Sequence, residues 1–438
     1  MYSGKPRKLL HERNIRVGDR IAVEKNGIRY EGTLMPRPEI GDAACIVIKL
    51  DNGYNIGIDC RNVRISKLTD EKNGREGVAT GTFRMNKKNP QVSIVTTGGT
   101  ITSKIDYKTG GVTSLTTPDD LQRKIPRLGK FAKIRIENPF NIMSESMTPS
   151  HWQNLAKVVA RELRKSEGVI VTHGTDTLHF TAAALSFMLR DLNKPVVLTG
   201  SQRSTDRGSS DGFSNIICSA RVALSDMAAV GICMHANMDD DYCIFTRGTK
   251  VRKMHTSRRD AFRPINDIPL AKVWPDGKIE KLQGVPPRKK GAVKLETSFE
   301  PKVALVKFYP GCNPEIIDYY LKKGYKGLVV EVTGLGQLPT YGKNSWIDTI
   351  KRATERGMLI FGAAETIYGR LNPNVYTEGR LTKEAGLIHL QDMLPETAYV
   401  KLGWVLGQTK KPEKVAERML TNYAGEMRDR TVMGTFLV

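Results

Sequence analysis

Two runs of β-branched residues dominate the hydrophobic pattern, and each ends in a loop that carries glycine and hydroxyl side chains. The first run covers residues 91–101, and the same pattern returns at residues 168–177. Each run predicts a buried parallel strand whose carboxyl end opens into a glycine-containing loop. Ligands bind at that edge of open α/β sheets, so the two loops mark the first place to look for a site.

From residue 91 to about residue 263, strands alternate with helices. Apolar residues recur at helical spacing over residues 151–164, after a start signal at residues 148–150. The pattern predicts further helices at 181–192 and 212–223, and strands at 195–199 and 230–234. This alternation indicates an α/β fold with a doubly wound parallel sheet.

The pattern resumes in a second, smaller α/β domain. Strands are expected at residues 303–308, 327–332 and 358–363, helices at 313–323 and 344–356, and a final helix or two over about 383–420. Between the domains, a segment rich in proline and lysine contains one hairpin, at 273–279. We therefore expect domains at 91–275 and 303–438, joined by a connector at 276–302.

The N-terminal part has a different pattern. Residues 1–68 contain five short alternating stretches with polar turns, the clearest turn being residues 51–54, and they predict a small SH3-like β barrel. Residues 69–90 show no periodicity and are rich in glycine, lysine and asparagine, which is typical of a linker.

Composition narrows the class of protein. The 438 residues are 39% hydrophobic, and no apolar run reaches the ~20 residues of a membrane helix. The basic N-terminus lacks the apolar core of a secretory signal, so we expect a cytoplasmic protein without a membrane contact. The six cysteines are scattered without a Cys-x-x-Cys pair, which argues against a metal site or a disulfide framework.

Charge adds one further indication. The formal net charge of +22 favours polyanionic partners, of which RNA is the commonest in the cytoplasm. A thermophile's lysine-rich surface is the alternative, but glutamate should then rise as well.

Side chains with useful chemistry fall in the loops that this architecture places at the carboxyl edge of the sheet. One of them, Tyr107, lies in a glycine-hinged segment, residues 103–111, that is typical of a lid. The candidates are Thr100, Tyr107, Ser144, Glu145, Thr175, Asp176 and Lys253.

Each candidate also has a purely structural interpretation. The turn before Thr100 lacks the lysine of a phosphate loop, so nucleotide binding is weakly supported. Residues 172–177 can be an ordinary helix cap, because threonine and aspartate favour helix starts. Lys253 can be one of many solvated cations, and Tyr107 a loop aromatic. Each loop alone is better explained as structural, and only their combination is specific.

Together the loops suggest a threonine nucleophile. A threonine hydroxyl reacts only when a neighbouring base removes its proton. A desolvated Lys253 held by Asp176 can do this through Thr175, which follows the logic of a catalytic triad on other residue types. Backbone N–H groups of the glycine turns can stabilise the oxyanion.

The motifs at 96–101 and 172–178, with those at 195–202 and 210–212, resemble the signature motifs of the bacterial-type L-asparaginase family. The resemblance covers about residues 90–438 and implies an asparaginase-like two-domain body. It implies that Thr100 is the primary nucleophile with Tyr107 as its lid partner. Thr175, Lys253 and Asp176 would form the second catalytic group.

The resemblance also extends to substrate binding. Ser144 would hold the α-carboxylate end of the substrate. Glu145 stands where many family members carry glutamine, beside the expected position of the substrate's α-amino group. Family active sites are completed by a second subunit, which implies a homodimer core.

A small β domain and linker before such a body resemble the D subunits of archaeal glutamyl-tRNA(Gln) amidotransferases, the GatD family. That family hydrolyses L-glutamine and passes ammonia to an E subunit (GatE), which uses ATP and Mg to convert Glu-tRNA(Gln) to Gln-tRNA(Gln). The chain has no ATP loop of its own, so we expect it to bind no cofactor and to depend on a GatE-like partner. Two alternatives are a stand-alone cytoplasmic L-asparaginase and an RNA-binding scaffold with a vestigial catalytic fold.

Overall fold

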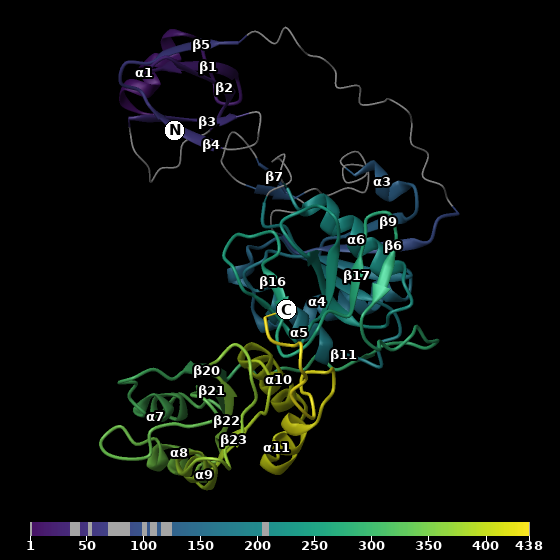
Figure 1. The fold of residues 1–438 in the computed structure, drawn as a ribbon, viewed down its shortest axis with the longest axis vertical. Helices are drawn as coiled ribbons and strands as arrows, with labels where there is room; N and C mark the ends of the chain where they lie inside the picture. Colours follow the sequence, from purple (N-terminus) through teal and green to yellow (C-terminus); the bar gives the residue numbers. More distant parts are fainter. Residues whose placement is uncertain are drawn as a thin grey trace.

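The computed structural model describes residues 2–35, 44–50, 55–68, 88–98, 103–105, 112–114, 125–203 and 210–437. Figure 1 shows a small N-terminal domain, a central α/β domain and a C-terminal α/β domain that packs against the central one. Thr100, Tyr107, the turn at 51–54 and most of the expected linker lie outside the described residues.

The N-terminal domain is a five-stranded antiparallel sheet in the order β4-β3-β2-β1-β5. The five predicted strands are present, as β1 (Arg20–Lys25), β2 (Ile28–Leu34), β3 (Cys45–Leu50), β4 (Asn55–Asp59) and β5 (Arg64–Lys67). The prediction missed α1 (Gly4–Glu12), which is too short and too polar to show a helical period. The helix is held in place by Tyr2, whose hydroxyl donates to Met35 O at 2.7 Å and accepts from Val47 N at 2.9 Å.

The central domain contains an eight-stranded sheet in the order β18-β17-β14-β13-β12-β10-β6-β9. The doubly wound parallel sheet is present in five strands, β6 (Gln91–Thr96), β9 (Lys133–Glu137), β10 (Gly168–Thr172), β12 (Val196–Thr199) and β13 (Val230–His235). Three further strands are antiparallel, β14 (Cys243–Arg247), β17 (Ala271–Val273) and β18 (Ile279–Lys281), and the last two form the predicted hairpin. The link between β13 and β14 is too short for a parallel crossover, so the direction reverses there.

Three helices cover the parallel part of the sheet. Helix α4 (Pro149–Leu163) begins as predicted, with Thr148 and His151 forming a capping box. Helix α6 (Gly212–Leu224) also agrees with its prediction. The boundaries predicted for the helix between them were wrong: α5 (Leu178–Met188) begins earlier and ends earlier, because it is buried almost all round and has no polar face to mark its limits. It is followed by β11 (Leu189–Arg190), paired with β19 (Lys294–Leu295).

The C-terminal domain has a four-stranded parallel sheet in the order β20-β21-β22-β23. The predicted elements are present, as β20 (Val303–Lys307), α7 (Glu315–Lys322), β21 (Gly327–Val332), α8 (Ile347–Glu355) and β22 (Leu359–Ala364). The expected helix from about residue 383 was wrong in its first part. That region contains the end of α9 (Thr377–Glu384) and then β23 (Leu387–His389), before α10 (Pro395–Gln408) and α11 (Pro412–Leu420). Three residues of strand are too few to show a period of two.

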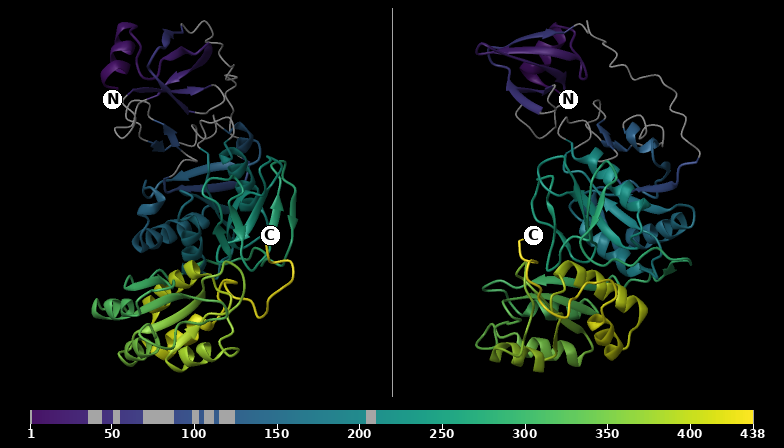
Figure 2. Two further views of the ribbon diagram at one scale, coloured as in Figure 1. Left: turned by 60° about the vertical axis from the view of Figure 1, so that its left-hand side comes forward. Right: turned by 45° about the vertical axis from the view of Figure 1, so that its right-hand side comes forward.

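The two α/β domains share one hydrophobic core. Helix α10 lies against α5 of the central domain, and the rings of Phe187 and Trp404 stack at 5.6 Å between them. The chain then returns from α11 to the central domain, where its last described residues lie (Figure 2). Placement of central-domain residues therefore depends on the C-terminal half of the chain.

Two compositional expectations can be compared with the structure. All six cysteines are thiols rather than halves of a disulfide, and all but the half-buried Cys45 are buried. In the described ranges, no helix combines the length and apolar character needed to cross a membrane.

Candidate active site

The loops after β6 and β10 open side by side. The strands are parallel neighbours with Thr96 opposite Thr172, and Thr97 N donates to Thr172 O at 3.1 Å just beyond the paired region. Gly98 follows with φ +115°, and a Cβ built there would lie 2.2 Å from Ile142 O. The turn thus needs glycine for its conformation and for its close approach to the segment before Ser144.

Thr175, Asp176 and Lys253 meet in space as the sequence predicts. Lys253 Nζ lies 2.9 Å from Thr175 Oγ1 and 2.8 Å from Asp176 Oδ1. The lysine side chain is only 11% exposed, whereas the Asp176 side chain is 66% exposed. The arrangement gives a threonine hydroxyl a direct amine neighbour, which is the geometry that a proton relay requires.

Lys253 reaches this position from a separate part of the chain. It ends the short strand β15 (Val251–Lys253), which pairs with β16 (Phe262–Pro264) outside the main sheet. The register places Lys253 opposite the buried Phe262. The neighbouring cations Lys250 and Arg252 are paired with Asp392 and Glu396 of the C-terminal domain, whereas Lys253 faces Thr175 and Asp176.

Ser144 also joins the loop cluster. It begins the 3-10 turn η2 (Ser144–Ser146), is 5% exposed, and its main-chain oxygen accepts a hydrogen bond from Thr177 Oγ1 at 2.7 Å. A Cβ at Gly174 would lie 2.9 Å from Ser144 Oγ, so glycine is required for the two loops to touch. Glu145 next to it is exposed.

Beneath Thr175, a chain of hydrogen bonds that the sequence analysis missed holds the loop. His173 Nδ1 lies 2.7 Å from Gly174 O, so Nδ1 carries the proton and Nε2 accepts from Thr181 Oγ1 at 2.9 Å. The Thr181 hydroxyl in turn accepts from Trp152 Nε1 at 3.0 Å. Burial lowers the pKa of His173 to about 4, against the weaker opposing effect of its bond to Gly174, and keeps the ring neutral. A histidine inside an otherwise apolar and hydroxyl-rich run was the available signal.

A second buried group supports the same loop from the β12 side. Asp211 is fully buried and accepts from Ser201 Oγ, Gln202 N and Arg203 N, each at 3.0 Å. A Cβ at Gly200 would lie 2.9 Å from Thr175 Cγ2. The motif at 195–202 and 210–212 therefore forms the wall on which Thr175 rests.

The described residues thus bring together five of the seven candidates, while Thr100 and Tyr107 lie outside them. Among the residues that the structure describes, no group of three or more histidine, cysteine, aspartate or glutamate side chains is arranged to hold a metal ion.

Comparison with known proteins places this fold in a class. The family model "Asparaginase, N-terminal" matches residues 91–285, and "Glutaminase/Asparaginase C-terminal domain" matches residues 302–419. The thermostable L-asparaginase from Thermococcus kodakarensis superposes with a TM-score of 0.71 at 29% identity, covering 78% of this chain and 100% of that one. L-asparaginase I from Vibrio cholerae gives 0.67 at 28% identity, with 78% and 99% covered. The body is therefore an asparaginase-type amidohydrolase fold.

The whole chain identifies the particular family. The model "GatD N-terminal domain" matches residues 15–68. The D subunit of the glutamyl-tRNA(Gln) amidotransferase of Pyrococcus horikoshii is 49% identical over 437 residues, covering 98% of this chain and 99% of that one. The corresponding D subunit of Methanothermobacter thermautotrophicus is 47% identical over 438 residues, with 99% of each chain covered. This chain belongs to the GatD family, the D subunits of glutamyl-tRNA(Gln) amidotransferases, as the sequence motifs predicted.

Proposed function

We propose that the chain is the glutamine-hydrolysing subunit of a tRNA-dependent amidotransferase, with Thr100 as nucleophile. One observation carries the proposal: Lys253 Nζ lies within hydrogen-bond distance of both Thr175 Oγ1 and Asp176 Oδ1, at the sheet edge where β6 leads toward Thr100. A structural lysine would need no threonine partner at that edge. The family to which the chain belongs supports glutamine as the amide donor.

The proposed chemistry has two halves. Thr100 Oγ attacks the side-chain amide carbon of glutamine, and its proton passes through the Thr175 hydroxyl to the amine of Lys253. In the tetrahedral intermediate, the amide nitrogen takes this proton back from Lys253 through Thr175 and leaves as ammonia, and a γ-glutamyl ester remains on Thr100. Water then adds to the carbonyl carbon of this ester, and the resulting tetrahedral intermediate breaks down to glutamate and the free Thr100 hydroxyl. Asp176 holds the lysine by accepting one of its hydrogens.

Substrate binding would use the opposite side of the site. Ser144 would donate to the α-carboxylate of glutamine, because its hydroxyl is buried against the Gly174 loop. Glu145 would carry the negative charge that pairs with the α-ammonium group. Tyr107 would close the site as a lid residue.

The ammonia would be consumed by a second protein. We propose a GatE-like subunit that binds ATP and Mg and amidates Glu-tRNA(Gln), while this chain forms a homodimer core and binds no cofactor itself. Two copies of each subunit would make a heterotetramer working in the cytoplasm. The net charge of +22 suits a complex that binds tRNA.

The test is steady-state hydrolysis of glutamine and of asparagine by the purified chain, alone and then with the partner and Glu-tRNA(Gln). Weak glutamine hydrolysis that rises only with both additions supports the proposal. Fast asparagine hydrolysis, unchanged by either addition, would instead mean a stand-alone asparaginase.

Variants test the residue roles. Thr100→Ala, Thr175→Ala and Lys253→Ala should each lower turnover by about a hundredfold or more. The matched control is Lys414→Ala, since Lys414 is exposed and pairs with Glu417 of its own helix. Normal turnover in Thr175→Ala or Lys253→Ala would refute the relay, and an inactive natural chain would favour the scaffold alternative.

A further inference from the structure

The strand that carries Lys253 is attached to the C-terminal domain at nearly every residue before it. Thr249 O accepts from Thr397 Oγ1 at 3.0 Å, and Thr249 Oγ1 donates to Ala424 O at 3.0 Å. Further along, Arg252 Nε lies 3.0 Å from Glu396 Oε1 in the first turn of α10. By contrast, Lys253 itself points back to the central domain.

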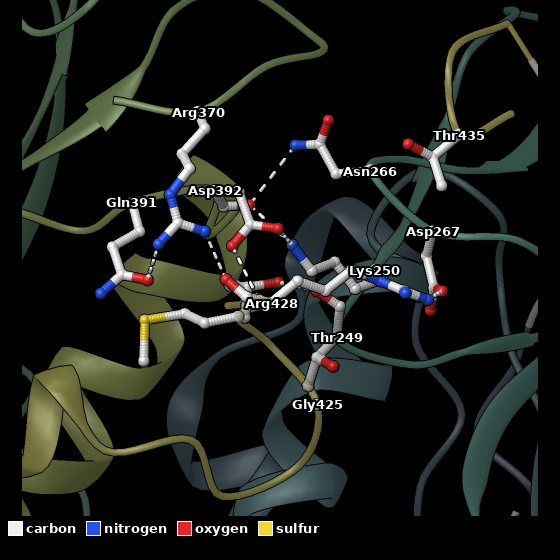
Figure 3. Close-up of polar contacts among 12 residues, drawn as sticks. Thr249, Lys250, Asn266, Asp267, Arg370, Gln391, Asp392, Gly425, Arg428 and Thr435 are labelled. Atoms are coloured by element: carbon white, nitrogen blue, oxygen red, sulfur yellow. Dashed lines mark hydrogen bonds and ion pairs between the residues drawn. The ribbon is translucent and has the colours of Figure 1, made fainter. Parts of the chain in front are cut away.

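The strongest attachment is Lys250. Its Nζ lies 2.7 Å from Asp392 Oδ2 and 2.7 Å from Asp392 O, and its side chain is fully buried (Figure 3). Asp392 lies between β23 and α10, and its other carboxylate oxygen accepts from Arg428 N at 3.0 Å. The pair thus joins the central domain, the C-terminal domain and the returning C-terminal segment at one point.

The surroundings of this pair are also polar and satisfied. The Arg428 guanidinium bonds to Asp267, which also accepts from Arg247 Nε at 3.2 Å. On the opposite side, Arg370 bonds to the main-chain oxygen of Arg428 and to Gln391 Oε1 (Figure 3). The Lys250–Asp392 pair is therefore surrounded by further hydrogen bonds that join the central domain, the C-terminal domain and the C-terminal segment.

A buried ion pair of this kind contributes little net stability, because the desolvation of two charges offsets most of their attraction. In some proteins such a pair instead specifies one arrangement of the chain around it. Here that arrangement includes the position of Lys253, three residues further along. An apolar pair would permit the strand to slide, whereas Lys250 must reach Asp392.

We propose that Lys250 and Asp392, assisted by Arg252 and Glu396, form a clamp through which the C-terminal domain positions Lys253 against Thr175. The clamp residues are positioning residues and do not contact the substrate. The inference rests on the proposed function, because it assumes that Lys253 is part of the relay. It adds that the C-terminal domain controls the catalytic lysine through side chains on the same strand.

The experiment compares Lys250→Met with a matched control in the full chain. Lys401 is also fully buried and bonded to a buried carboxylate, Glu426, at 2.6 Å, but it lies on α10 away from β15. Lys401→Met therefore removes a comparable buried ion pair whose link to the segment before β15 is indirect, through Glu426, Ala424 and Thr249. For both variants, glutamine hydrolysis and thermal unfolding are measured on the folded protein.

We expect Lys250→Met to lower kcat by about tenfold to a hundredfold with an unchanged KM, because a misplaced relay group slows chemistry without weakening binding. Lys401→Met should lower the unfolding temperature by a similar amount and leave kcat unchanged. Equal loss of kcat in the two variants would overturn the proposal, since the effect would then be general destabilisation.

If Lys250→Met does not fold, Arg252→Gln and Glu396→Gln replace it, because Arg252 is partly exposed. Each should lower kcat severalfold with an unchanged KM, and the double variant should be no worse than either single one. Additive losses, or normal kcat in both, would refute the clamp. Failure of the proposed function is distinguishable, because Lys253→Ala would then be fully active whatever the clamp variants do.

Discussion

Replacing His179 by leucine should make the central domain less sensitive to acid. His179 lies in the first turns of α5 with 9% of its surface exposed, and its Nδ1 is buried without a hydrogen-bond partner among the described residues. Burial, reinforced by the positive charges of Arg252 and Lys253, lowers the pKa of His179 to about 3 from an ordinary value of 6.5. Leucine fills the same space and carries no titrating group.

The magnitude follows from the difference between the two pKa values. An unfolded chain binds a proton at this imidazole below about pH 6.5, but the folded chain does not until the pH approaches about 3. Acidification through this window therefore favours unfolding. Because of this residue, the free energy of unfolding is about 2 kcal/mol lower at about pH 5, whereas the effect at about pH 8 is close to zero.

The assay is denaturant unfolding of the natural chain and of His179→Leu at about pH 8 and about pH 5. The pH-dependent loss of stability should be about 2 kcal/mol smaller in the variant, while carboxylates that titrate in both chains cancel. His11→Gln, at an exposed site in α1, serves as the control and should behave like the natural chain. If His179→Leu loses as much stability as the natural chain, burial does not suppress protonation at this residue.

Gly98→Ala should lower both the unfolding temperature and glutamine turnover, because the new Cβ adds a clash with Ile142 O to the backbone strain of φ +115°. Gly369→Ala has nearly the same φ of +118° but open space around it, so it should lower stability by the backbone strain alone and leave turnover intact. Equal effects of the two variants would mean that close packing at Gly98 is unimportant. Glu162→Gln should cost about 2 kcal/mol at neutral pH in denaturant unfolding, because the buried carboxylate accepts hydrogen bonds from several cations. Burial raises the pKa of Glu162, but the hydrogen bonds outweigh burial and hold the pKa below its usual range. The stabilisation is therefore lost as the pH falls below about 4.5. A Glu162→Gln variant as stable as the natural chain at neutral pH would contradict this prediction. Asp318→Asn should change stability by less than about 1 kcal/mol, since its arginine partner is 44% exposed; a larger loss would show that solvent does not screen this pair.

Local patterns were sufficient for most of the secondary structure. Alternating and helical periods predicted the five N-terminal strands, α4 with its start signal, and the parallel strands β6, β10, β12, β13, β20, β21 and β22, but not β9. They failed for α5, whose burial on all sides removes the periodic signal, and for β23, which is too short to have one. The sequence motifs also predicted the family correctly.

The candidate site was predictable only as a set of loops. Motif and strand order indicated that Thr175, Asp176 and Lys253 would share one sheet edge, because the carboxyl ends of parallel strands lie together. The position of His173 in an apolar run and of Asp211 in a motif marked both residues, but the pattern did not indicate which groups they bond to. Their roles appear only when their partners are known.

By itself, then, the sequence determined the elements, the family and the candidate groups, because these depend on residues close together in the chain or on recurring motifs. The tertiary structure showed that these groups touch and which further groups hold them, although the motifs had already suggested that Asp176 holds Lys253. Lys253 and Asp176 are 77 positions apart, and Lys250 and Asp392 are 142 apart. Such contacts depend on how two domains pack, and a local pattern contains no information on the distance between side chains that meet only after folding.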